Sequence, residues 1–320
     1  MRIRNIGIDI LKFFAALLIT NSHMDMLYVK YGALATGGAI GDVLFFFCSG
    51  FTLFLSKTGR FDNWYKRRIN RIYPTIFAWA IIGAFIFNCQ YGMDYTIIHG
   101  GGWFVTCIMI YYAFLYFIQK FLINRLKLTF AIVSIICIVW YLLIDRPIGY
   151  NMYGATYFKW GHYFLFMLLG AMMGISKRTW NFNLKFDLLK LIVSLVFYYG
   201  ILFLGKRYAE IEEWQIISLI PLLFVVVYFY KVCSSDTLKS IYNTKYIGWG
   251  MKLISGLCLE IYLVQGTLFT DKMNNIFPLN IPIMFVIVIL GAYILRCGAR
   301  IFSQTFKEEN YKWEEIIRFI

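Results

Sequence analysis

The chain of 320 residues is 60% hydrophobic, 20% aromatic and only 15% charged. Soluble domains carry about 25% charged residues, so this composition excludes an ordinary soluble enzyme and predicts an all-α integral membrane protein. The formal net charge of +14 does not indicate nucleic-acid binding, because cytoplasmic loops of membrane proteins are rich in Lys and Arg. The seven cysteines are scattered without a C-x-x-C pair, so we expect no metal site and no disulfide framework.

Apolar segments predict about ten membrane spans in a single membrane domain, residues 1–305. They lie near residues 6–23, 38–56, 72–88, 103–119, 128–144, 160–176, 187–204, 214–230, 253–270 and 283–303. With both termini in the cytoplasm, most Lys and Arg residues fall in cytoplasmic segments and few in outer loops, as the positive-inside rule requires. Residues 306–320 alternate charged and apolar side chains, which predicts an amphipathic cytoplasmic tail on the membrane surface.

The first predicted span carries three ionisable residues: Asp9, Lys12 and His23. At about 100° per residue, Lys12 and His23 point within about 20° of each other, and Asp9 lies near the same stripe. Charged groups are costly in hydrocarbon, so we expect this stripe to face protein or a polar cavity. His23 lies about 16 Å from Lys12 along the helix. Because imidazole exchanges protons readily near neutral pH, His23 is the leading candidate for a general base.

A basic segment, residues 57–71, is predicted to be a loop before the third span. Arg68 and Arg71 are three residues apart, so on a helix they would share a face, and guanidinium groups grip phosphate well. The alternative is that the segment anchors on anionic lipid. Pro74 is compatible with the first turn of the third span.

Small residues mark two other segments. In the second span, Ser49 and Gly50 follow a run of phenylalanines, a pattern typical of a helix-packing notch. Gly100, Gly101 and Gly102 precede Trp103 on the outer side. They predict a flexible loop with an interfacial tryptophan, or a loop whose backbone N–H groups approach a substrate.

The ninth predicted span holds Glu260 at a depth of about 10 Å, close to that of Lys12. Lys12 could therefore pair with Asp9 or with Glu260. A purely structural buried ion pair is the alternative interpretation. His162 opens the sixth span, where we expect a helix-end or interface residue rather than a catalyst.

Together these motifs resemble the acyltransferase-3 family of integral membrane O-acyltransferases, over nearly the whole chain. Asp9, Lys12 and His23 match its first-span pattern, although family members usually have Arg at the position of Lys12. Phe45–Phe51 is similar to the family's F-F-x-x-S-G-F element, and Arg67–Pro74 is similar to its R-R-x-x-R-I-x-P element. Trp103-Phe104 followed by Tyr111-Tyr112 is similar to its fourth span. A late Y-L-x-H element is matched in part by Tyr262–Gln265, which ends in Gln.

The resemblance implies transfer of an acyl group, usually acetyl, from cytoplasmic acetyl-CoA to a hydroxyl of a cell-surface polysaccharide or glycolipid. It also implies a bacterial inner membrane, with the lipid bilayer, the acyl-CoA donor and the carbohydrate acceptor as partners and a homo-oligomer as one arrangement. The predicted site comprises catalytic His23, Asp9 and Lys12, donor-binding Arg67, Arg68, Arg71, Tyr73 and Ser49, and substrate-binding Trp103, Glu260 and Tyr262.

Two other classes of function remain open at this point. A polytopic transporter or flippase of glycan or lipid would also suit a polar stripe on one helix face. A non-catalytic membrane sensor or assembly partner would tolerate the loss of His23.

Overall fold

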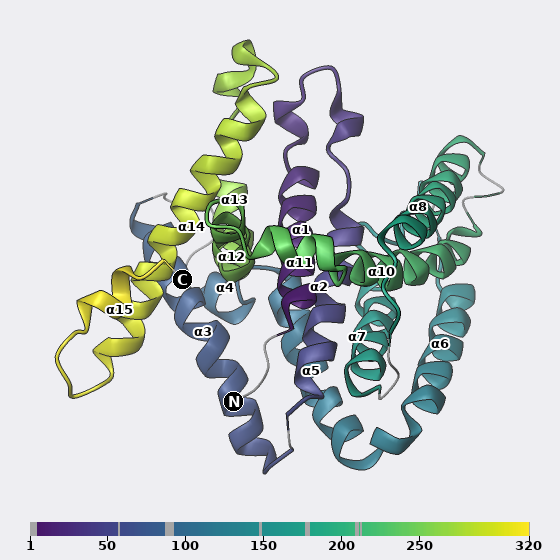
Figure 1. Cartoon of the computed structure of the whole chain (residues 1–320), viewed down its shortest axis with the longest axis horizontal. Helices are drawn as coiled ribbons and strands as arrows, with labels where there is room; N and C mark the ends of the chain where they lie inside the picture. The colour runs from purple at the N-terminus through teal and green to yellow at the C-terminus, as the bar shows by residue number, and fades with distance from the viewer. Residues whose placement is uncertain are drawn as a thin grey trace. The chain divides into compact units, whose positions relative to one another are not determined.

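The computed structural model describes residues 5–56, 58–86, 93–146, 149–176, 180–208, 211 and 213–319. These residues form helices joined by turns and contain no strand (Figure 1). The predicted all-helical fold is therefore confirmed. Residue 57 of the predicted basic loop, residues 87–88 of the third predicted span and Ile320 lie outside the described residues.

The chain divides into two compact units, each built from three segments. Unit 1 comprises Met1–Ala15, Ala39–Lys57 and Ile118–Trp249, and unit 2 comprises Ala16–Gly38, Thr58–Phe117 and Gly250–Ile320. Four of the five boundaries fall within or at the ends of helices α1 (Ile6–Ser22), α2 (Gly38–Leu53), α5 (Trp103–Phe121) and α12 (Ile247–Gly256), and the fifth falls between α2 and α3 (Phe61–Phe85).

Unit 1 is a bundle of long helices and their connections. It contains the first part of α1, nearly all of α2, η3 (Ile123–Arg125), α6 (Leu126–Leu143), α7 (Lys159–Ile175), α8 (Leu184–Arg207), η4 (Gln215–Ser218), α10 (Leu219–Cys233) and α11 (Asp236–Tyr242). Helix α8 packs along α10, and α6 packs along α7. Lys231 at the end of α10 reaches Asp187 at the start of α8, with 2.5 Å between Nζ and Oδ1.

Glycines bring α2 and α7 into backbone contact within unit 1. A Cβ atom on Gly50 would lie 1.8 Å from the carbonyl oxygen of Met167. A Cβ on Gly170 would lie 2.1 Å from the oxygen of Phe47, and one on Gly174 would lie 2.6 Å from that of Phe51. Any larger side chain would push the two helices apart. The predicted packing notch at Gly50 is therefore what the structure contains.

Unit 2 is centred on α3 (Phe61–Phe85), which packs along α14 (Asn280–Thr305) and against α13 (Cys258–Leu268). Its remaining elements are η1 (Asp25–Leu27), η2 (Gly32–Leu34), α4 (Met93–Ile98), most of α5, the end of α12, η5 (Asp271–Ile276) and α15 (Trp313–Ile317). Helix α4 lies against α3, and α13 lies against α14.

The start of α3 corrects two predictions. The segment expected to be a loop is helical from Phe61 onward, so Pro74 lies more than three turns inside the helix and not in its first turn. Asp62 in the first turn favours a helix beginning there, because a negative charge complements the positive end of the helix dipole. Proline removes one backbone hydrogen bond, and membrane helices tolerate this because their surroundings satisfy the freed group.

The membrane-spanning character is confirmed in its coarser form. Among the described residues, six helical segments are long and apolar enough to cross a bilayer: Gly32–Leu53, Met93–Phe121, Ile123–Leu143, Leu184–Arg207, Gln215–Cys233 and Asn280–Thr305. The ninth predicted span is broken at Leu257 into α12 and α13, which are bent by 81°. Counted as one, this pair makes a seventh span. The full count of ten stays a prediction.

The C-terminal tail is helical only over Trp313–Ile317 and is held by α14. The hydroxyl of Tyr293 donates to the carbonyl oxygen of Ile317 at 2.5 Å, and the Tyr293 ring stacks on Phe319 with centroids 4.3 Å apart. Arg300 donates to the carbonyl oxygens of Ile316 and Arg318. The tail therefore binds its own chain, and its location on a membrane surface stays a prediction.

Candidate active site

The two units share the predicted site residues unequally. Unit 1 contains Asp9, Lys12 and Ser49. Unit 2 contains the others: His23, Arg67, Arg68, Arg71, Tyr73, Trp103, Glu260 and Tyr262. The contacts that follow are those within each unit.

Asp9 is buried in the first turn of α1 and Lys12 is half-buried three residues later. The hydroxyl of Tyr242, at the end of α11, donates to Asp9 Oδ2 at 3.4 Å. A tyrosine donor is a suitable partner for a carboxylate that has little access to water. The expected pairing of Lys12 with a carboxylate stays a prediction.

His23 is exposed at the first position after α1, in a segment fixed by side-chain to backbone hydrogen bonds. Asn21 donates from Nδ2 to the carbonyl oxygens of Leu34 and Thr36, at 2.8 and 3.0 Å. It accepts from the hydroxyl of Tyr28 at 2.6 Å. These bonds close the loop after α1 onto the end of the helix. His23 is thus an accessible imidazole on an ordered support, as a group that receives a substrate proton requires.

The basic residues predicted to bind the donor lie on the first half of α3. Arg67 and Arg71 are exposed, whereas Arg68 is half-buried. The guanidinium carbon of Arg68 lies 4.7 Å from the ring centroid of Trp64 and 5.8 Å from that of Tyr112 on α5. Aromatic faces attract a guanidinium group and hold its plane in one orientation. Arg68 is therefore positioned by packing as well as by charge.

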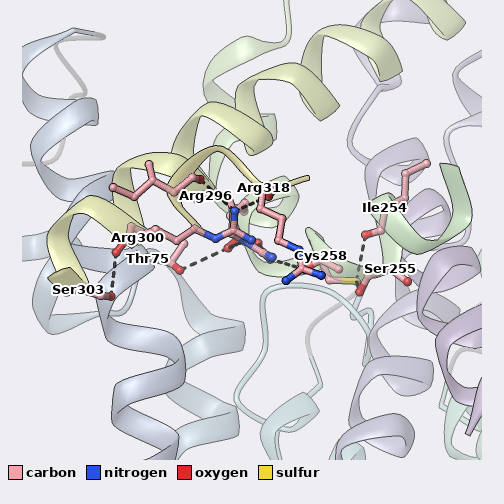
Figure 2. A network of polar contacts seen from close by, with 12 residues as sticks. Thr75, Ile254, Ser255, Cys258, Arg296, Arg300, Ser303 and Arg318 are labelled. Carbon is pink, nitrogen blue, oxygen red and sulfur yellow. Dashed lines mark hydrogen bonds and ion pairs between the residues drawn. The ribbon is translucent and has the colours of Figure 1, made fainter. Parts of the chain in front are cut away.

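Glu260 is held by a residue that the sequence did not suggest as its partner. Arg296 on α14 binds it through two parallel hydrogen bonds, Nε to Oε1 and Nη2 to Oε2, both 2.8 Å long (Figure 2). Thr75 on α3 adds a hydroxyl donor at 3.4 Å. The carboxylate is only 4% exposed. A bidentate pair of this geometry, with a third donor, satisfies a buried carboxylate.

The same arginine compensates the break between α12 and α13. Backbone carbonyls at the end of a helix have no partner within the helix, and they are costly to leave unsatisfied away from water. Arg296 Nη2 donates to the carbonyl oxygen of Gly256, the last residue of α12. The thiol of Cys258 lies 3.2 Å from the oxygen of Ser255 and 3.6 Å from that of Ile254 (Figure 2).

One signal in the sequence could have found Arg296. By the positive-inside rule Arg296 belongs to the positive charges of a cytoplasmic end, yet it lies well inside α14, with nine residues of the helix still to follow. An arginine within an apolar run predicts a buried carboxylate partner. Glu260 was the available candidate in the neighbouring predicted span.

The glycine loop before α5 packs on Tyr262. Gly100, Gly101 and Gly102 have φ values of 60°, 78° and 148°, which side chains larger than hydrogen rarely adopt. A Cβ on Gly102 would lie 2.5 Å from the Tyr262 hydroxyl. The ring of Phe104 lies 5.7 Å from that of Tyr262. The structure thus brings the segment around Trp103 and Tyr262 together, as two parts of one surface of unit 2.

The alternative prediction for this loop, backbone N–H groups directed at a substrate, is wrong. Gly100, Gly101 and Gly102 donate their N–H groups to the carbonyl oxygens of Ile97, Thr96 and His99, at 3.4, 2.9 and 3.0 Å. The donors are used within the loop itself. The glycines allow the positive φ values of the loop and the close approach of Tyr262 to Gly102.

Helix α3 connects the predicted donor-binding and substrate-binding residues of unit 2. Thr75 follows Arg68 by seven residues, so the two side chains lie on nearly the same face, about 10 Å apart along the axis. Thr75 contacts Glu260, and Tyr262 is two residues further along α13. The side chains predicted to bind phosphate and the helix that carries the predicted substrate-binding residues are therefore linked through one continuous element, α3.

Comparison with protein families gives one match. The family model described as an acyltransferase domain matches residues 5–297, from the start of α1 to within α14. No curated protein and no solved structure matches the chain. The matched range includes every residue of the predicted site.

Proposed function

The chain belongs to the acyltransferase-3 family, and from this premise we propose that it moves an acetyl group from cytoplasmic acetyl-CoA to a hydroxyl of a cell-surface carbohydrate. The observation that carries the proposal is the family match over nearly the whole chain. A bent helix pair such as α12 and α13 also occurs in transporters. The family match favours group transfer over transport.

The proposed topology has ten spans, both termini in the cytoplasm, and a bacterial inner membrane around it. Besides the six apolar segments and the bent pair, three helices complete the count. Helices α1 and α7 are 17 residues long, about 25 Å, which is near the lower limit for crossing a bilayer. The apolar second half of α3 forms the remaining span, and its basic first half lies on the cytoplasmic side.

The proposed donor site is the basic face of α3 at that side. Arg68 and Arg71 bind the phosphates of acyl-CoA, with Arg67 and Tyr73 as further donor-binding residues. Ser49 lies on α2 in unit 1, and its donor-binding role stays a prediction. The orientation of Arg68 by Trp64 and Tyr112 supports this role, because a fixed guanidinium group loses little entropy when it binds phosphate.

The proposed catalytic group is His23, with Asp9 and Lys12 completing the set along α1. As a general base, the imidazole takes the proton of the acceptor hydroxyl while the hydroxyl oxygen attacks the thioester carbonyl. The C–S bond then breaks, and the thiolate of CoA leaves and takes up a proton. A second route, transfer of the acyl group to His23 itself before the acceptor attacks, has the same overall balance.

The test is His23→Ala in purified, detergent-solubilised protein. We expect transfer to be abolished while the protein stays folded. His99→Ala is the matched control, since His99 is an exposed imidazole whose ring contacts that of Tyr95 at a tilted angle of 37°. Mass spectrometry after incubation with labelled acetyl-CoA alone distinguishes the routes, because only the covalent route leaves an acetylated His23. Wild-type product formation by His23→Ala would refute the catalytic assignment.

A further inference from the structure

Three aromatic rings form a stacked surface where α3 begins and α5 ends. The ring of Phe61 lies 5.5 Å from that of Tyr65 at an interplanar angle of 25°. It lies 5.7 Å from that of Phe117 at 22°. Near-parallel rings at these distances are offset-stacked, so an exposed ring at the end of the stack offers its outer face to another planar ring. We call Phe61, Tyr65 and Phe117 the aromatic platform.

The platform is accessible and rests on a fixed base. Phe61 is 39% exposed and Phe117 is 50% exposed, whereas Trp64 and Tyr116 beneath them are buried. The hydroxyl of Tyr116 donates to the carbonyl oxygen of Gly59 at 2.9 Å, and that of Tyr65 donates to Met109 at 3.2 Å. Exposed rings on such a support have little freedom to lose when a ligand covers them.

The surroundings of the platform are cationic. Lys66, Arg67 and Arg71 are exposed on the same half of α3. Phe61, Tyr65 and Arg68 follow the spacing i, i+4 and i+7, so they lie on one face over about 10 Å. At 25 residues, α3 is about 38 Å long and exceeds the hydrocarbon core of about 30 Å. Its charged first turns therefore lie in the headgroup layer or water, and so does the platform.

The outer face of a stacked ring beside guanidinium groups suits a ligand that joins a planar heteroaromatic ring to phosphates. Nucleobases stack on aromatic side chains irrespective of their hydrogen-bonding edges, and arginine binds the phosphates. We propose that the platform binds the adenine ring of the acyl-CoA donor and so fixes the nucleotide end while the acyl end is transferred. This inference rests on the proposed function, which supplies an adenine nucleotide as the donor.

The experiment compares two donors that share the reacting end. Acetyl-CoA carries the adenine nucleotide, and acetyl-phosphopantetheine lacks it. For Phe61→Ala and for Phe117→Ala we expect KM for acetyl-CoA to rise about tenfold, the loss expected for one base-stacking contact, with kcat unchanged. KM for acetyl-phosphopantetheine should stay at the wild-type value, and Phe61→Trp should keep the wild-type KM for acetyl-CoA. Phe197→Ala, at a 63% exposed ring on α8, is the matched control.

The outcomes separate this inference from its premise. Equal changes of KM for both donors, or no change for either, would overturn it and leave the platform as an interfacial anchor. If the wild-type protein transfers acetyl from neither donor, the proposed function fails. In that case calorimetry measures the binding of adenosine 3′,5′-bisphosphate. Binding about tenfold weaker by both variants than by the wild type supports the platform as an adenine site. No binding by the wild type refutes the adenine site. Should Phe61→Ala not fold, Phe117→Ala carries each comparison.

Discussion

Each unit buries a carboxylate beside a cation. One pair joins the ends of two helices, and the other lies beside a break within a span. In unit 1, Asp187 is 2% exposed and lies 2.5 Å from Lys231. In unit 2, Glu260 is 4% exposed and lies 2.8 Å from Arg296. The first pair joins the ends of two continuous helices, α8 and α10. The second lies beside a break, where Arg296 also serves the end of α12.

The difference lies in what surrounds each pair. Asp187 is in the first turn of α8 and its second oxygen accepts from the backbone N–H of Asn183 at 2.9 Å, while Lys231 is in the last turn of α10. Both charges complement helix dipoles, because the carboxylate lies at the start of one helix and the ammonium group at the end of the other. Arg296 is well inside α14, and its contact with the Gly256 carbonyl replaces a hydrogen bond that a straight helix would have made at this point. The pair at the helix ends therefore stabilises the packing of α8 on α10, whereas the pair at the break maintains the bend between α12 and α13.

The largest expected effect comes from removing the cation at the break. Arg296→Met leaves the Glu260 carboxylate and the Gly256 carbonyl without their donor, and we expect a loss of about 3–5 kcal/mol in the free energy of unfolding, as for other buried charges that lose a partner. Thermal unfolding in detergent measures this.

The double variant Arg296→Met with Glu260→Gln is its control. It should recover part of the loss, because a neutral amide is cheaper to bury than a carboxylate. If the two substitutions are simply additive, the pair does not maintain the break.

A smaller loss is expected at the helix ends of unit 1. Asp187→Asn keeps the shape of the side chain and an oxygen for the Asn183 N–H, and the flexible Lys231 can turn its ammonium group toward water. We expect about 1–3 kcal/mol, the cost of one charged hydrogen bond, in the same unfolding assay. A loss as large as that of Arg296→Met would remove the distinction between the two pairs.

The third donor to Glu260 should contribute less again. Thr75→Val keeps the volume of the side chain and removes a long hydrogen bond of 3.4 Å, so we expect about 0.5–1 kcal/mol. Thr129→Val on α6, where the hydroxyl bonds to its own helix, is the matched control. An effect of Thr75→Val larger than that of Arg296→Met would show that Thr75 and not Arg296 dominates the network.

The smallest effect is expected for an exposed pair in the tail, Glu309 and Lys312, 3.1 Å apart. The hydrogen bond from Lys312 lowers the pKa of Glu309, and that bond raises the pKa of Lys312. A lowered carboxyl pKa contributes stability above the ordinary carboxyl pKa and loses it as the pH falls through the lowered value.

Any difference in melting temperature between wild type and Glu309→Gln at neutral pH should therefore be slight and should disappear in acid. Melting curves at about pH 7 and about pH 3 measure it. A difference that grows on acidification would contradict the assignment of the shift to this pair.

The sequence was sufficient to predict the features that depend on a local pattern of residues. Apolar runs located the helices, and the arrangement of Asp9, Lys12 and His23 with the later motifs indicated the family. The sequence was insufficient to predict the start of a helix whose first turns are polar and extend beyond the apolar segment. The charged residues from Lys66 to Arg71 interrupt the apolar pattern and predict a loop, although the aromatic residues in the first turns of α3 pack on α5.

The rest of the site depends on contacts between residues that are distant in the sequence. Arg296 and Glu260 are 36 residues apart, and each taken alone is compatible with several partners. The approach of Tyr262 to Gly102 depends on how α13 lies against the loop before α5. The break at Leu257 had only Ser255 and Gly256 as a local signal, and small residues of this kind also occur in unbroken membrane helices.

The glycine contacts between α2 and α7 have a consequence for the exchange of segments between relatives. Gly50 belongs to the motif that supported the family assignment, and its counterparts Gly170 and Gly174 lie in a segment with no recognised motif. A chimera that takes α2 alone from a relative would pack that helix against the α7 of the recipient protein, whose glycines need not match it. We therefore expect an exchange of segments between members of this family to give a folded protein only where both helices are transplanted together.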